Sequence, residues 1–169
     1  MRRPLRRRPL DLVIAIFFLV NLVFITYQVD LEQLVIADPN HFAYPFWPPG
    51  PVVDAVHWWG RSFDPLLMAR PQWWKMTIWV DVLLYGPFYA VAVYALWRDR
   101  PWIRVPIAVW AGAMLFDVTV IMGEELFGPF ATPAPLMVWA ANAGWILFPL
   151  LALYRAWLTR PLSRSASPG

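Results

Sequence analysis

The chain has 169 residues, of which 60% are apolar, with 12 Trp and no Cys. Soluble proteins hold about 45–50% apolar residues, and here the excess lies in long runs, so the composition indicates a single-domain integral membrane protein. The lack of Cys excludes disulfides, thiolate catalysis and Cys-ligated metals, and the net charge of +3 does not indicate nucleic-acid binding, because the basic residues cluster at the expected membrane edges.

The N-terminal region combines a basic arm with a long apolar segment. Residues 1–9 contain five Arg, and the apolar segment follows over about residues 10–37. A cleaved signal peptide is one interpretation, because a weak cleavage motif ends at Ala37. The segment is longer than the roughly 7–15 residues of a signal-peptide core and contains Asp30 and Glu32, which favours an uncleaved first span.

Residues 38–71 form a connection rich in Pro and aromatic residues. This Pro content excludes a long helix, although a short amphipathic helix is expected over residues 52–63. The segment is too apolar for a flexible linker, so we expect it to pack across the outer mouth of the bundle as a lid. Its two His, His41 and His57, are isolated in the sequence and do not indicate a metal site.

Three further apolar segments are each long enough to cross a bilayer, which takes about 20 helical residues. They run over about residues 73–97, 105–122 and 135–157, and Pro87 is expected to kink the first of them. The polar residues 159–169 are expected to form a disordered tail. The predicted fold is therefore all-α, a four-transmembrane-helix bundle with an aromatic, Pro-rich outer loop.

The distribution of basic residues predicts the orientation of this bundle. Arg residues concentrate in the N-terminal arm, in the connection after the second span and at the C-terminal end, whereas the opposite side holds only Arg61, Arg70 and Lys75. The positive-inside rule then predicts cytoplasmic termini. Glu124 and Glu125 are expected near the outer interface, exposed to solvent. A single Lys among many Arg hints at a bacterial origin, in which case the membrane is the plasma membrane.

Each predicted span carries a polar residue at a similar depth, namely Asp30, Asp81, Asp117 and Asn142. At a rise of 1.5 Å per residue they lie roughly 9–12 Å below the outer interface. A carboxylate at that depth needs a partner or a proton, so we expect one shared pocket. Such acids can hold an ammonium group or carry out acid–base chemistry, and the ring of Trp79 can stabilise a cation. Interhelical hydrogen bonding without a ligand is the alternative.

Several short motifs resemble the EXPERA domain family. Residues 58–67 (WWGRSFDPLL), 71–75 (PQWWK) and 102–106 (WIRVP) are similar to its sigma-2 receptor branch. Gly86-Pro87, Asp117 and the sequence Asn142-Ala143-Gly144-Trp145 are similar to its emopamil-binding sterol isomerase branch. The resemblance covers about residues 11–157, nearly the whole chain.

The resemblance implies a helical bundle around a cavity for sterols or cationic amphiphiles. In the receptor branch an acid holds the amine of the ligand, and in the isomerase branch a double bond migrates by protonation and deprotonation. It makes Asp81 the central acid, with Asp30, Asp64, Asn142 and Trp145 around it. We therefore assign Asp81, Asp30 and Asp117 as candidate catalytic residues, and Asp64, Asn142, Trp145, Tyr27 and Trp79 as candidate ligand-binding residues.

The sequence departs from the isomerase branch in the first two spans. That branch pairs a His with a Glu one helical turn later, whereas here the acid is Asp30, and Thr26 and Tyr27 stand one turn before it. No His lies in any predicted span, and the acid at position 81 is Asp instead of Glu. The group expected to cooperate in proton transfer is therefore missing.

Three functions are compatible with these residues. The first is binding of a sterol-like, isoprenoid or cationic amphiphilic ligand; the second is an isomerase or cyclase that uses carboxylate proton transfer on an alkene. The third is a structural or assembly role through the aromatic loop. No cofactor, metal or nucleic acid is expected, membrane lipid is an expected partner, and a homodimer is left open.

Overall fold

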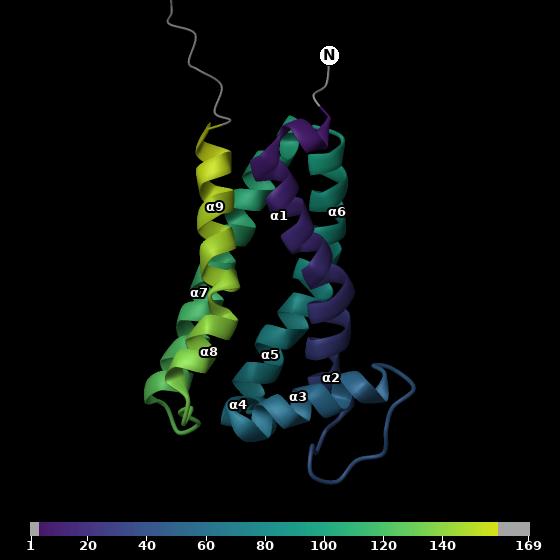
Figure 1. Cartoon of the computed structure of the whole chain (residues 1–169), viewed down its shortest axis with the longest axis vertical. Helices are drawn as coiled ribbons and strands as arrows, with labels where there is room; N and C mark the ends of the chain where they lie inside the picture. Colours follow the sequence, from purple (N-terminus) through teal and green to yellow (C-terminus); the bar gives the residue numbers. More distant parts are fainter. Residues whose placement is uncertain (1–3, 159–169) are drawn as a thin grey trace, which may run out of the picture.

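The computed structural model describes residues 4–158, and the elements in that range are all helical. Four helical stretches are long and apolar enough to cross a membrane, which makes this a multi-pass membrane protein and confirms the predicted all-α fold (Figure 1). They comprise residues 9–35, 72–97, 101–127 and 135–158. The predicted disordered tail, residues 159–169, lies outside the described residues.

The first two spans are each built from two α-helices joined by a π-helical segment. Span one consists of α1 (Pro9–Val20), the π segment Asn21–Asp30 and α2 (Leu31–Val35). Span two consists of α5 (Gln72–Val80), the π segment Asp81–Tyr85 and α6 (Gly86–Trp97). The two π segments pack against each other. Each bears a candidate acid at one end, Asp30 or Asp81.

Pro87 accounts for the contact between the π segment of span two and span one. Pro lacks the N–H that would bond the carbonyl five residues earlier in a π-helix, so the Val82 carbonyl needs another donor. The Tyr27 hydroxyl supplies it at 3.1 Å. Gly86 allows this approach, because a Cβ there would meet the Tyr27 hydroxyl at 2.6 Å. At the position of the predicted kink, the structure therefore has a π segment whose freed carbonyl is bonded by the neighbouring span.

Spans three and four pack closely against each other and complete the bundle. Span three begins with the 3₁₀ turn Pro101–Ile103 and continues as α7 (Arg104–Phe127), five residues beyond the predicted end at Met122. Span four consists of α8 (Pro135–Asn142) and α9 (Gly144–Leu158), which meet at Ala143. The chain leaves α7 at Gly128, just before Pro129, where helix continuation is unfavourable.

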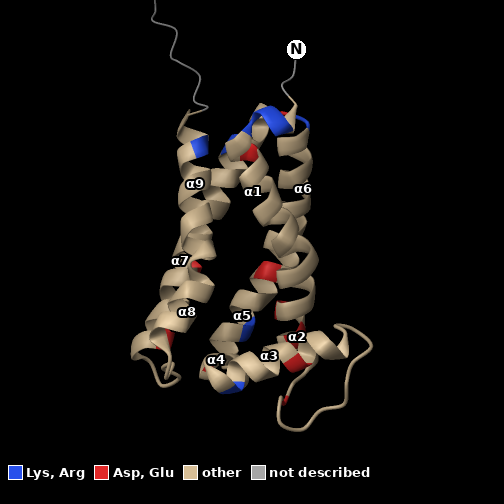
Figure 2. Cartoon of the chain, viewed as in Figure 1, with Lys and Arg blue, Asp and Glu red and all other residues tan. Residues whose placement is uncertain are grey.

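The two ends of the bundle differ in packing. Near the N-terminus, α1, α6, α7 and α9 enclose an aromatic core in which Phe18 and Tyr89 are fully buried and the Phe18 ring lies edge-on to Trp110, 4.8 Å between centroids. Basic residues concentrate at this end (Figure 2). There Asp11 is buried and paired with Arg8 and with Arg155, whose Nε donates to Asp11 Oδ1 at 2.6 Å.

The loop between spans one and two forms two short helices that lie across the opposite end of the bundle (Figure 1). These are α3 (Gly50–Ser62) and α4 (Pro65–Ala69). The helix predicted over residues 52–63 therefore exists, shifted by one or two residues. Residues 38–71, which carry both helices, are called the lid below. The Thr132 hydroxyl donates to the Phe63 carbonyl and ties the lid to the connection after α7.

Candidate functional site

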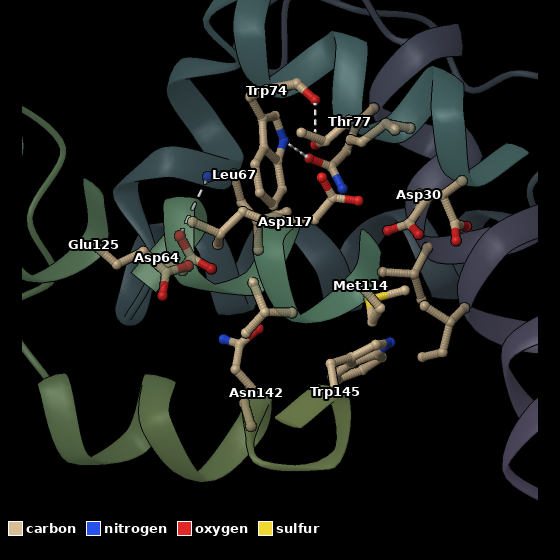
Figure 3. A pocket seen from close by; sticks show the side chains of 18 of the residues that line it. Asp30, Asp64, Leu67, Trp74, Thr77, Met114, Asp117, Glu125, Asn142 and Trp145 are labelled. Carbon is tan, nitrogen blue, oxygen red and sulfur yellow. Dashed lines mark hydrogen bonds between the residues drawn. The ribbon is translucent and has the colours of Figure 1, made fainter. Parts of the chain in front are cut away.

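A cavity of about 230 Å³ lies between the lid and the four spans. A single water needs only about 10–15 Å³ of such volume, so the cavity has room for a ligand. Six of the eight candidate residues line it, and they come from all four spans and the lid (Figure 3). These six are Asp30, Asp64, Asp81, Asp117, Asn142 and Trp145.

Asp30 and Asp81 bring two carboxyl groups within hydrogen-bonding reach of each other. Asp30 ends the π segment of span one and Asp81 begins that of span two, so the contact between these segments sets their approach. The Tyr89 hydroxyl donates to Asp81 Oδ1 at 3.4 Å, and the Thr26 hydroxyl lies near the same carboxyl, but the buried Asp81 Oδ2 accepts no well-formed hydrogen bond. A hydrogen bond between two carboxyl groups requires a proton, and a bound cation is the other way to satisfy the pair.

Asp117 adds a third carboxylate from α7. The Tyr85 hydroxyl, from the π segment of span two, donates to Asp117 Oδ2 at 2.6 Å. This short bond occupies one side of the carboxylate and leaves the other available toward the cavity that both residues line. Asp30, Asp81 and Asp117 are called the inner acids below.

Span four supplies an aromatic wall at the junction of α8 and α9. The Trp145 indole donates from Nε1 to Asn21 Oδ1 at 3.0 Å, which fixes the ring against span one. The Asn142 amide donates from Nδ2 to the Val138 carbonyl at 3.0 Å. Both side chains line the cavity, and Figure 3 shows them across it from Asp30 and Asp117.

A second pair of carboxyl groups lies at the lid end of the cavity. Asp64 caps α4 by accepting a hydrogen bond from the Leu67 N–H at 3.3 Å. Its carboxyl also lies within hydrogen-bonding reach of Glu125 on α7 (Figure 3). Burial raises the pKa of Asp64, while the Leu66 and Leu67 N–H groups act in the opposite direction. Glu125 is 1% exposed, and its Oε2 has no hydrogen-bond donor.

Tyr27 and Trp79 are not among the residues that line the cavity. The Tyr27 hydroxyl bonds the Val82 carbonyl at the joint between spans one and two. The Trp79 side chain is 43% exposed on the outside of the bundle. These two candidates are therefore not brought together with the other six.

Sequence reasoning missed Glu125 and Gln33, which both line the cavity. Glu125 was expected in solvent, yet α7 continues past it and turns its side chain inward. The sequence signal was its spacing of eight residues from Asp117, which places both near one helix face. Gln33 accepts a hydrogen bond from Trp74 Nε1 at 2.6 Å, and its buried Nε2 has no partner.

A buried ionic cluster beside the cavity was also not predicted. Arg70 donates from Nη2 to both Glu32 oxygens, at 2.9 and 2.8 Å, and His57 Nε2 lies 2.8 Å from Glu32 Oε1. This Glu32–His57–Arg70 cluster ties the lid to α2 and does not line the cavity. Across residues 4–158, no group of three or more His, Asp or Glu is arranged to hold a metal ion.

The charges around the cavity have one sign. Five carboxyl groups line it, while no Lys, Arg or His among the described residues does so. Its walls are otherwise mostly apolar or aromatic. The site can therefore accept a cationic or hydrogen-bond-donating group within an apolar ligand.

Comparison with known proteins gives two kinds of match. The family model for EBP: EXPERA (EXPanded EBP superfamily) matches residues 51–156. That range includes Asp64, Asp81 and Asp117, whereas Asp30 lies before it.

Among individual proteins, the chain is similar to sigma intracellular receptor 2 of Xenopus tropicalis, at 31% identity over 119 residues. This alignment covers 69% of the chain and 65% of the receptor, slightly less than two thirds of its length. The Homo sapiens receptor of the same name is 26% identical over 135 residues, covering 78% of the chain and 70% of the receptor.

Proposed function

This chain belongs to the EXPERA (EXPanded EBP superfamily) family, and from this premise we propose that it binds a hydrophobic amine in its cavity. The ligand is a cationic amphiphile or an amine analogue of a sterol or isoprenoid. Its ammonium group bonds the inner acids, and its apolar body lies against Trp145 and the aliphatic walls. The chain is a membrane protein similar to sigma intracellular receptor 2.

The observation that carries this proposal is the unbalanced charge of the cavity. Buried carboxylates in proteins are paired with cations or hydrogen-bonded, because an isolated charge in a low-dielectric site is costly. Among the described residues the cavity has no basic side chain, and Asp81 Oδ2 accepts no well-formed hydrogen bond. An ammonium group supplies both the charge and the N–H donors.

The test is amine binding to the purified protein in nanodiscs, measured by titration calorimetry with octylamine and with neutral octanol. Asp30→Asn and Asp81→Asn are each expected to weaken octylamine binding by about tenfold or more, as for lost charge-assisted hydrogen bonds. Octanol binding should change little. The matched control is Asp54→Asn, since Asp54 is an exposed lid acid away from the cavity. Equal octylamine affinity in wild type and both variants would contradict the proposal.

A second candidate function is proton transfer to an isoprenoid or sterol alkene. The adjacent carboxyl groups of Asp30 and Asp81 favour it, because one can give a proton to a double bond while another removes a proton from the neighbouring carbon. Incubation with an alkene substrate in heavy water tests this candidate. Deuterium in the lipid with wild type but not with Asp81→Asn supports an enzyme, and its absence despite bound lipid supports binding alone.

We further propose that both termini are cytoplasmic and that the lid lies outside. The concentration of Arg at the end opposite the lid supports this orientation (Figure 2). Because the chain has no Cys, a single engineered Cys reports the side of each end. Asn40→Cys in the lid should react with a membrane-impermeant maleimide in intact cells, and Trp102→Cys should not. The reverse pattern would overturn the orientation.

A further inference from the structure

The lid end of the cavity holds a polar centre that amine binding at the inner acids does not use. It consists of Asp64 from the lid and Glu125 from α7, whose carboxyl groups lie within hydrogen-bonding reach of each other. Glu125 is 1% exposed, and no protein donor bonds its Oε2. Two facing carboxyl groups share a proton or hold a cation between them, and no Lys, Arg or His among the described residues lines this cavity to supply the cation.

One face of α7 connects this centre to the inner acids. Asp117 and Glu125 are eight residues apart, which corresponds to about 12 Å along the helix axis. Val118 and Ile121 lie between them and line the same cavity. The helix therefore presents a carboxylate at each end of an apolar strip.

A third unsatisfied group points to a polar ligand independently of the acids. Gln33 is 1% exposed and lines the cavity, and its Oε1 accepts the Trp74 indole N–H. This bond assigns the amide orientation, because an indole only donates. The remaining Nε2 is a buried donor without a partner. An unmade buried hydrogen bond is costly, and this donor needs an acceptor such as a hydroxyl oxygen, which a purely hydrocarbon ligand does not supply.

We propose that Glu125 and Asp64 form a second polar subsite, and that the ligands of this chain are elongated amphiphiles with a hydrogen-bond-donating group at each end. One end is the ammonium held by the inner acids, and the other is an ammonium or hydroxyl group held by Glu125, which lies about 12 Å from Asp117 along the axis of α7. The proposal rests on the proposed function, and it narrows the ligand class from amines to two-ended amines and amino alcohols.

The experiment compares octylamine with the α,ω-diamine of the same eight-carbon chain, using calorimetry on the full chain in nanodiscs. Wild type is expected to bind the diamine about tenfold more tightly, as for one added charge-assisted hydrogen bond. Glu125→Gln should remove this advantage, so that the diamine loses far more affinity than octylamine does. The matched control is Glu124→Gln on the same helix, because Glu124 accepts a hydrogen bond from the Phe130 N–H at 3.0 Å and does not line the cavity.

The outcomes separate this subsite from the proposed function. If octylamine binding depends on Asp30 but the diamine has no advantage, the subsite is overturned and the proposed function stands. A diamine advantage that persists in Glu125→Gln also overturns the subsite. If neither amine binds wild type, the proposed function fails and the subsite fails with it.

A second measurement uses wild type alone and tests the subsite even if Glu125→Gln does not fold. It compares the diamine with the monoamine at chain lengths of four and eight carbons in wild type. A four-carbon diamine is too short to connect Asp117 with Glu125, which lie about 12 Å apart along the axis of α7, so its advantage over butylamine should vanish. An equal advantage at both lengths would overturn the subsite.

Discussion

Two carboxylates on span one, Asp30 and Glu32, are only two residues apart and have opposite surroundings. Glu32 is fully buried, accepts two hydrogen bonds from Arg70 and faces His57. Asp30 faces a second acid, Asp81, and the cavity. One carboxylate is neutralised by the protein, and the other is left for a proton or a ligand.

The cluster around Glu32 is complete within the protein. Arg70 also donates to the carbonyls of Leu67 and Ile36, at 2.9 and 2.6 Å. It therefore joins the last residues of the lid to the end of span one. This chain therefore places an Arg beside a buried acid where the role of that acid is structural. At the cavity, which no basic residue among those described lines, the acids remain available.

The largest effect is expected from breaking the complete cluster with Arg70→Met. This change leaves the Glu32 carboxylate buried without its guanidinium, and such a loss costs about 3–5 kcal/mol. The free energy of unfolding, from denaturant titration of the protein in micelles, should fall by that amount. Arg61→Met is the control, because Arg61 is exposed and bonds only the Pro39 carbonyl in the lid. Equal losses of unfolding free energy in both variants would show that the buried pair of Arg70 with Glu32 stabilises the protein no more than the exposed contact of Arg61.

A smaller effect is expected when spans one and two are forced apart by Gly86→Ala. The added Cβ would meet the Tyr27 hydroxyl at 2.6 Å and the Thr26 methyl at 3.1 Å. Overpacking of this kind costs about 1–3 kcal/mol. Because Asp30 and Asp81 stand at this joint, octylamine affinity should fall as well, while the cluster around Glu32 should keep its His57 contact.

A double variant, Tyr27→Ala with Gly86→Ala, tests whether crowding against Tyr27 causes the loss of stability in Gly86→Ala. Removing the Tyr27 ring makes room for the added methyl group, so the double variant should lose less stability than the sum of the two single changes. Strictly additive losses, measured by the same denaturant titration, would mean that the two residues are not coupled.

Asp81→Asn is expected to raise the free energy of unfolding, opposite in sign to the expected effect of Arg70→Met. Asp81→Asn replaces one of two facing carboxyl groups by a neutral amide whose N–H₂ can donate to Asp30. In the absence of ligand, the free energy of unfolding should rise by about 1 kcal/mol, the typical net value of one hydrogen bond. If the free energy of unfolding instead fell as much as in Arg70→Met, Asp81 would be a structural carboxylate like Glu32.

The inner acids could be predicted from the sequence because helix geometry converts position into depth. Asp30, Asp81, Asp117 and Asn142 each interrupt an apolar run at a similar distance from its outer end, and all four line the cavity. The role of Asp64 was predicted from a motif resemblance and not from helix geometry. The four spans followed from length and apolar composition alone, and these properties survive small errors in the helix ends.

The positions of several other residues could not be predicted from the sequence, for physical reasons. Tyr27 lies in a π segment, where each turn holds more residues than the 3.6 assumed for an α-helix, so its direction was not given by the usual periodicity. Glu125 lay beyond the expected helix end. The pairing of Glu32 with Arg70 joins residues 38 positions apart through the irregular lid, and no local pattern specifies such a contact.

The smallest effect on stability is expected at Asp64, which resembles both Glu32 and Asp30. Like Glu32 it accepts a hydrogen bond from the protein, here from the Leu67 N–H, and like Asp30 it faces another acid. Burial raises its pKa above the ordinary Asp value of 3.8. The folded protein therefore holds a proton that the unfolded chain releases. The contribution of Asp64 to stability is complete below pH 3.8 and is lost as the pH rises through the pKa of Asp64 in the folded protein.

Asp64→Asn should make the unfolding free energy depend less on pH above 3.8 than it does in wild type. Asp54→Asn, at an exposed lid position, should leave this pH dependence unchanged. An unchanged slope in Asp64→Asn would mean that the lid docks with this carboxyl ionised, and would group Asp64 with Glu32 instead of with the cavity acids.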